Sequence, residues 1–433
     1  MSSTRRDFLV GGLSAGAAVP LLGGGAQLAP KWMQAAAGSG PGDQVTVIIQ
    51  LSGGWDWMNL MVPADAGVYY NARPNTGIPK NKTLGRIDNK TATATYWHPA
   101  VQAFKDLYGR GDLALIQNVG YPKPNLSHFR SYKKWHSADP AATTVSTGWL
   151  ANWLKKGYTG GFSIPALNID RRLNPAFATA RVPVLRSLST YEINSDTKSP
   201  SGQDKALELQ LMESNAAVLR PTATPTLQFL TNSTEGAFSD SRTLPAIGAN
   251  YVPKATYPSN AARFTSDLQL AARLISGGLK SDLYYLNVGG WDHHANQVLA
   301  NDSTQGKFAT MTGYLSAGIK AFIDDMKAWG KDKNVVVMVF SEFGRRVGQN
   351  GSLGCDHGHG GLALMAGTPV TGGTYGTYPD MTKVTTPYSR YYLPFDGRST
   401  DFRSLYATLL EKWMGAKHGP ILGGTFPLLG CLP

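Results

Sequence analysis

The chain has 433 residues, of which 42% are hydrophobic and only 16% are charged, and its formal net charge is +12. This composition excludes a disordered or fibrous protein and predicts a globular one with a substantial core and many loops. The lysines and arginines are scattered without a dense run. They therefore predict a solvated basic surface with some preference for anionic partners, and not nucleic-acid recognition.

The first 37 residues have the parts of a twin-arginine signal peptide in the right order. Arg5 and Arg6 precede an uncharged, glycine-rich stretch over residues 10–29, and alanines 35–37 offer a cleavage site. An uncleaved membrane anchor is the alternative, but the stretch is weakly apolar, and no later segment is suited to span a bilayer. We expect export by the twin-arginine translocase to the periplasm or cell exterior, and a mature domain over residues 38–433.

Predicted strands and helices alternate along the mature chain. Apolar, β-branched runs predict strands over residues 44–51, 113–116, 166–169, 283–288, 335–340 and 362–366. Helical spacing predicts helices over residues 99–108, 129–135, 264–275, 308–329 and 401–413, the last with Thr400 as its N-cap. This order predicts an α/β fold with a mostly parallel central sheet and helices on both faces. The polar region 170–260 is predicted to be an insertion or lid, with a helical piece at 204–215.

Cys355 and Cys431 are the only cysteines of the chain. They permit one disulfide in an oxidising compartment, but their spacing does not match a zinc knuckle. The sequence leaves open whether they pair.

Acidic residues and histidines gather where the predicted strands end, which is where ligands bind in open α/β sheets. Singly, Asp56 could cap a helix, Glu342 could be a solvated acid, and the segment 356–359 could be a polar turn. Together they predict a divalent metal site, because zinc and iron take histidine and carboxylate ligands and manganese favours oxygen. The candidate ligands are Asp56, Asp292, His294, Glu342, Asp356, His357 and His359.

Ser127 is the candidate nucleophile, since a metal ion could activate its hydroxyl and a helix start could receive an anion. It is equally suited to be the N-cap of the following helix, and the two roles are compatible. Arg345 could bind an ester oxygen bidentately or form a surface ion pair. Trp55, Trp57 and Trp291 could wall a pocket or fill the core.

Several motifs together resemble the domain-of-unknown-function 1501 family, over about residues 44–415. They are Gly53-Gly54-Trp55-Asp56, Asn118-Val119-Gly120, Ser127-His128-Phe129-Arg130, Gly289-Gly290-Trp291-Asp292, Ser341-Glu342-Phe343-Gly344-Arg345 and Asp356-His357-Gly358-His359-Gly360-Gly361. That family is itself similar to the alkaline phosphatase and sulfatase superfamily of metal-dependent hydrolases. The resemblance implies an alkaline phosphatase-like fold.

The resemblance also implies roles for single residues. Asp56 would bind one metal, Asp292 with His294 would hold the second, and Ser127 would be the nucleophile. Glu342 would stand for the aspartate of the superfamily's Asp-His pair, and His357 or His359 for its late histidine. Phe343 stands where the second histidine of that pair is expected, so Asp356 or the spare histidine replaces this ligand, or the site holds one ion.

These observations predict an exported hydrolase of phosphate or sulfate esters that uses one or two divalent ions, zinc ahead of manganese, calcium and iron. Its substrate would be an anionic small-molecule or polymeric ester, and no other cofactor is expected. Two alternatives remain open. One is a non-catalytic binding or surface protein with a degenerate metal site, which Phe343 favours. The other is a metalloenzyme with different chemistry, since a fold does not fix a reaction.

Overall fold

The computed structural model describes residues 43–88, 93–160, 164–188, 207, 209–215, 224–381 and 399–433. The predicted signal peptide and its cleavage site lie outside the described residues, as do residues 204–206 of the predicted helical piece. Within the described ranges, no helix combines the length and the apolar character needed to cross a membrane.

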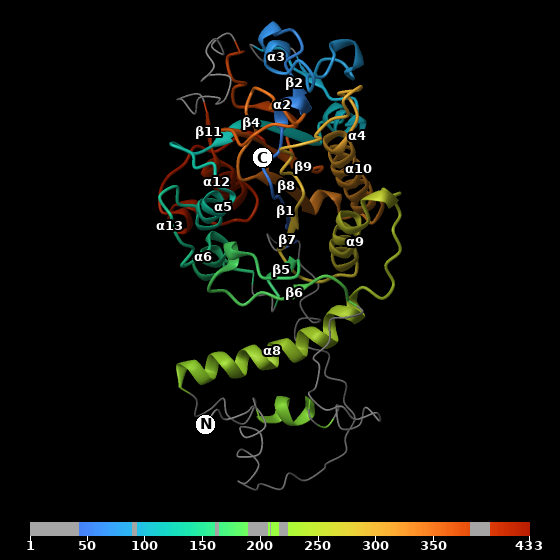
Figure 1. Cartoon of the computed structure of the whole chain (residues 1–433). Helices are drawn as coiled ribbons and strands as arrows, with labels where there is room; N and C mark the ends of the chain where they lie inside the picture. Colours follow the sequence, from blue (N-terminus) through green and yellow to red (C-terminus); the bar gives the residue numbers. More distant parts are fainter. Residues whose placement is uncertain are drawn as a thin grey trace, which may run out of the picture. The chain divides into compact units, whose positions relative to one another are not determined.

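A nine-stranded sheet forms the centre of the described domain (Figure 1), in the order β10-β4-β9-β8-β1-β7-β5-β6 with β11 also paired to β4. The strands are β1 (Val45–Leu51), β4 (Leu113–Gly120), β5 (Ala166–Ile169), β6 (Val184–Leu185), β7 (Leu283–Val288), β8 (Val335–Ser341), β9 (Gly361–Ala366), β10 (Gly373–Tyr375) and β11 (Thr400–Asp401). Only β9 runs antiparallel to its neighbours, β4 and β8. The predicted mostly parallel sheet is confirmed. A separate two-stranded sheet joins β2 (Met61–Val62) to β3 (Tyr96–Trp97).

Helices cover both faces of this sheet, as predicted (Figure 1). One face carries α4 (Gln102–Gly109), α9 (Ala262–Ser276) and α10 (Lys307–Ala328), and the other carries α5 (His128–Ser137), α6 (Trp149–Lys156), α12 (Phe402–Lys412) and α13 (His418–Leu422). In β1, Val47 and Ile49 pack into the first core and Ile48 into the second. This two-sided burial explains why the strand is an unbroken apolar run.

The remaining helices are short, except for one. They are α2 (Trp57–Leu60), α3 (Gly67–Ala72), the long α8 (Pro225–Ile247) and the 3-10 turns Lys80–Lys82, Pro175–Phe177, Ser259–Ala261 and Asp332–Asn334. The polar composition of region 170–260 concealed α8, although Thr224 and Pro225 provide an N-cap and a first-turn proline.

Two local predictions need correction or completion. The N-cap of α12 is Asp401, whose Oδ1 accepts a hydrogen bond of 2.9 Å from the Arg403 amide, and not Thr400, which lies in β11. Cys355 and Cys431 are both buried and free. The optional disulfide between them is therefore not formed.

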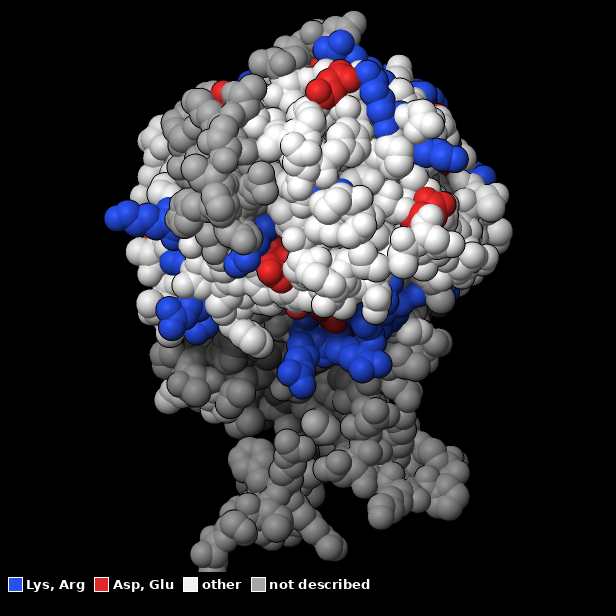
Figure 2. Space-filling model, turned by 45° about the horizontal axis from the view of Figure 1, so that its top comes forward, with Lys and Arg blue, Asp and Glu red and all other residues white. Residues whose placement is uncertain are grey.

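Strand direction brings five loops to one edge of the sheet. The strands β1, β4, β7 and β8 all end at this edge, whereas the antiparallel β9 begins there. The loops that follow four strands and the loop that precedes the fifth therefore meet. On the face shown in Figure 2, lysines and arginines lie mostly at separate places between wide uncharged areas.

Candidate metal centre

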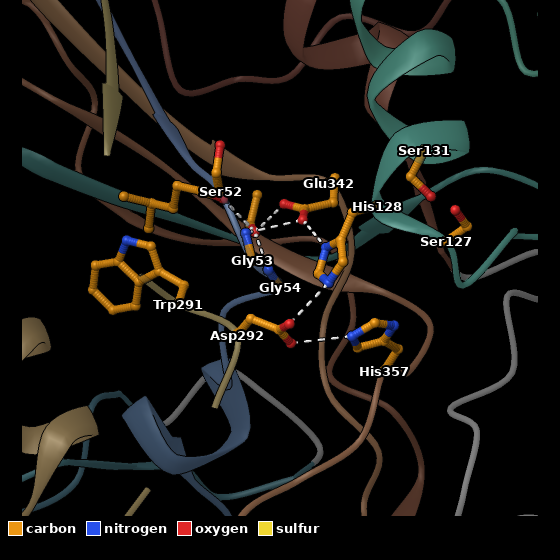
Figure 3. Close-up of polar contacts among 12 residues, drawn as sticks. Ser52, Gly53, Gly54, Ser127, His128, Ser131, Trp291, Asp292, Glu342 and His357 are labelled. Carbon is orange, nitrogen blue, oxygen red and sulfur yellow. Dashed lines mark hydrogen bonds and ion pairs between the residues drawn. The ribbon is translucent and has the colours of Figure 1, made fainter. Parts of the chain in front are cut away.

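Three histidines and one aspartate lie close together at this edge, and Figure 3 shows His128, His357 and Asp292. His128 begins α5 after β4, Asp292 and His294 follow β7, and His357 precedes β9. One oxygen of Asp292, Oδ1, lies 3.0 Å from Nε2 of His294 and 3.1 Å from Nε2 of His357. The other, Oδ2, lies 3.3 Å from Nε2 of His128. His128, Asp292 and His357 thus direct ligand-type atoms to one point, and His294 lies beside this group, against Asp292 and His357.

The second ring nitrogen of each of these histidines is held by an oxygen. Nδ1 of His128 lies 2.6 Å from Oε1 of Glu342, and Nδ1 of His357 lies 2.6 Å from the Leu126 carbonyl. Nδ1 of His294 lies 3.0 Å from Oδ1 of Asp356. With a metal ion bound, these oxygens would accept a hydrogen bond from each Nδ1, and each Nε2 would offer its lone pair to the ion. This arrangement is typical of metal-binding histidines.

The residues present fit a bound cation on two further counts. The Nε2 atoms of His294 and His357 are 2.8 Å apart, so the two rings direct a nitrogen to the same place. Nε2 of His128 is buried and, among the described residues, makes no hydrogen bond. Within the same part of the chain, His128, Asp292 and His357 form the one group of three or more ligand-type residues whose atoms lie within 4.8 Å of one another.

Glu342 holds the ring of His128 in place. Its side chain is fully buried, and Oε1 accepts hydrogen bonds from His128 and from the Gly53 amide at 2.9 Å. Its Oε2 accepts one from the Ser341 hydroxyl at 2.9 Å. Both oxygens are therefore used inside the protein, and Glu342 orients a ligand in this geometry.

Gly53 permits this contact. Its φ of +132° is a conformation that residues with side chains rarely adopt, and a Cβ there would lie 2.4 Å from the Asp292 amide nitrogen. The glycine lets the loop after β1 pack directly on the backbone that carries Asp292.

Arg345 holds Asp292 in its ionised form. Its buried guanidinium donates to the carbonyls of Gly53, Gly54 and Cys355 and, at 2.6 Å, to Oδ1 of Asp292. Burial alone would raise the pKa of Asp292, but the hydrogen bond and charge of Arg345 outweigh it and bring this pKa to about 2. The predicted ester contact would compete with these internal hydrogen bonds.

The pKa of His128 reflects the charges that surround its ring. Burial alone would lower it, but the hydrogen bond to Glu342 and the charges of Glu342 and Asp292 outweigh burial and raise it above the usual value. For His357, burial dominates and lowers the pKa. The negative charge at the centre therefore favours a cation beside His128.

The other predicted ligands lie around this centre. Both oxygens of Asp56 bind Arg73, at 2.7 and 3.0 Å, and one also accepts from Gln297 at 2.6 Å. Asp356 orients His294 and also contacts Arg346, at 3.3 Å. His359 is half-buried and lies outside the group of His128, Asp292 and His357. The structure thus gathers Asp292, His294 and His357 at the centre and places Asp56 in a buried ion pair.

Ser127 occupies the N-cap position of α5, but its hydroxyl makes no capping hydrogen bond. Its neighbours on both sides contact the centre, Leu126 through its carbonyl and His128 through its ring. The ring of Phe343 packs against His128 and His357, with centroids 4.9 and 4.8 Å away. Phe343 is thus a wall of the site.

His128 is the central residue that our candidate ligand list omits. Its signal is present in the sequence, because it follows a predicted strand at the same sheet edge as the other loops. A lone histidine beside a candidate nucleophile gives no sign that its ring, and not the serine, points to the centre.

The protein has an α/β sheet with a cluster of histidines and an aspartate at its carboxyl edge. Comparison with known families shows to which family the chain belongs. Residues 113–393 match the family described as "Protein of unknown function (DUF1501)", so the chain belongs to that family, as predicted. No curated protein sequence matches the chain.

The chain is also similar to several solved structures. One is a protein in the alkaline phosphatase superfamily from Vibrio parahaemolyticus, with 11% identity, 89% of this chain and 71% of that chain covered, and a TM-score of 0.39. Phosphonate monoester hydrolase from Silicibacter pomeroyi has 10% identity, coverage of 88% and 77%, and a TM-score of 0.35. Alkaline phosphatase from the Antarctic bacterium TAB5 has 10% identity, coverage of 77% and 94%, and a TM-score of 0.30.

Proposed function

We propose that this protein is a metal-dependent hydrolase of phosphate or sulfate esters, with one divalent ion held by His128, His294, His357 and Asp292. The observation that carries the proposal is that three Nε2 atoms lie within 3.3 Å of the Asp292 oxygens while each Nδ1 lies against an oxygen of another residue. Histidine nitrogen and carboxylate oxygen are ligands that suit zinc best. A bound ion would supply a Lewis acid that polarises the ester and lowers the pKa of a nearby hydroxyl.

Several residues of the chain would have separate roles in this reaction. Arg345 keeps Asp292 ionised, and Glu342 fixes the ring of His128, so the centre is preorganised. The first-turn amides of α5 form the positive end of the helix dipole and would receive an ester oxygen. Ser127 Oγ would then bond to phosphorus or sulfur as the bond to the leaving alcohol breaks, and its proton would pass through solvent to that alcohol. Water would release the seryl ester.

One observation favours a second candidate, a non-catalytic metal-binding protein. Four protein ligands complete the coordination of a structural zinc site, whereas catalytic sites keep a position open. Against this, the side chains of Asp292 and His294 are 45% and 44% exposed, so solvent and substrate can reach the centre.

Hydrolysis of p-nitrophenyl phosphate and p-nitrophenyl sulfate by zinc- and manganese-loaded protein separates the two candidates. We expect Ser127→Ala to lower kcat by at least about 10³-fold with unchanged metal content. Ser137→Ala, at the other end of α5, is the matched control, because its hydroxyl bonds only to nearby backbone, the carbonyls of Lys133 and Lys134 and the Asp139 amide. Loaded protein with no turnover of either ester would contradict the hydrolase and leave the binding protein. Turnover that survives Ser127→Ala would replace the serine by water as the attacking group.

A further inference from the structure

A second cavity lies at the same sheet edge, between the end of β7 and the helices α9 and α10. Its volume is about 370 Å³. In Figure 3 the indole of Trp291 turns away from Asp292, His128 and His357, so consecutive residues face the cavity and the metal centre. The apolar part of the lining consists of Ala261, Phe264, Val288, Trp291, Met311 and Leu315.

The lining includes a buried carboxylate whose negative charge is only weakly paired. Asp267 is 4% exposed, and its Oδ2 lies 3.5 Å from Nε of Arg263, which is a long contact. Burial raises the pKa of Asp267 to about 6, because the charge is poorly solvated and only weakly paired.

The same guanidinium also serves a second carboxylate. The Nη2 atom of Arg263 lies 3.1 Å from Oδ1 of Asp170, and the Arg263 side chain is half exposed. One positive charge is therefore shared between two carboxylates, of which Asp267 lines the cavity.

We propose that this cavity binds the methylated ammonium group of a small molecule. A primary ammonium needs acceptors for three N–H groups, and a lining made mostly of carbon offers few. A quaternary ammonium needs none, is attracted by a carboxylate, and packs favourably against aromatic side chains, here Phe264, Trp291 and Tyr314. The proposal rests on the cavity alone and does not require the metal or the esterase activity.

Isothermal titration of the full chain with choline tests the proposal. The control ligand is 3,3-dimethylbutan-1-ol, which has the same shape with carbon in place of the charged nitrogen. We expect choline to bind about 10-fold more tightly than this alcohol, with or without zinc. Equal binding of the two ligands would overturn the cation site in favour of an apolar pocket, and no binding of either would overturn the site altogether.

Substitutions in the wall give effects of opposite sign. Asp267→Asn should lower choline affinity about 10-fold and remove the preference over the alcohol. Arg263→Gln should raise choline affinity, because it removes the competing cation. Asp282→Asn, at the other end of β7, is the matched control and should change neither. A choline affinity that Asp267→Asn and Arg263→Gln both leave unchanged would contradict the proposed role of this wall.

Discussion

The sharpest test of the metal centre is the substitution Glu342→Gln, because it removes one charge and keeps the shape. The new side chain can still accept hydrogen bonds from His128 and the Gly53 amide through its carbonyl oxygen. Its amide would lie beside the Ser341 hydroxyl, which can turn its single proton to the Leu51 carbonyl 2.7 Å away and already accepts long hydrogen bonds of 3.2 Å from the Gly54 and Trp55 amides. The fold should therefore persist, and the change isolates the effect of the carboxylate on the ligand.

Loss of a carboxylate behind a metal-binding histidine typically costs 10- to 100-fold in metal affinity, or about 1.4–2.7 kcal/mol. We expect this loss for zinc in competition with a chromophoric chelator. Glu411→Gln is the matched control, because Glu411 also lies 2.6 Å from a histidine Nδ1, that of His418, on the helix α12 to α13 connection. Zinc affinity unchanged in Glu342→Gln, or lowered equally in Glu411→Gln, would refute the reasoning.

Three further predictions separate ligands from scaffold. Asp292→Asn should abolish zinc binding, measured as metal content after dialysis. Asp56→Asn should leave zinc content unchanged but destabilise the fold by about 3–5 kcal/mol in urea unfolding, because it leaves the buried guanidinium of Arg73 without its counter-ion; zinc loss without destabilisation would make Asp56 a ligand. The third concerns Asp282, whose pKa burial raises from 3.8 to about 7. The folded state then binds more protons than the unfolded state between these values, so stability falls as pH rises through this window. The stability of Asp282→Asn relative to the wild type should thus be about 1–2 kcal/mol greater at pH 8 than at pH 4. An equal difference in stability at both pH values would contradict this assignment.

The sheet was predictable because its strands are buried on both faces. Residues such as Ile48 and Ile49 pack into different cores, so both must be apolar, and the whole strand becomes visible as an uninterrupted run. The helix α8 was not visible, because its residues include many serines and threonines and few apolar ones at helical spacing.

One part of the site could be predicted from the sequence and another part could not. Strand direction alone brings the loops of Asp292, His294 and His357 to one edge, so their proximity could be predicted. Which carboxylate faces the centre depends on partners remote in the chain. Arg73 forms an ion pair with Asp56. The Gly53 amide and the Ser341 hydroxyl bind the oxygens of Glu342, so neither carboxylate faces the place where Asp292 and the histidines meet. Such pairings leave no periodic signal in the sequence.

The most direct measurement is a crystal structure of the zinc-loaded protein with anomalous scattering recorded at the zinc edge. We expect a single strong peak within about 2.0–2.2 Å of Nε2 of His128, His294 and His357 and of an Asp292 oxygen. A peak beside Asp56, two peaks, or no peak between these four side chains would contradict it.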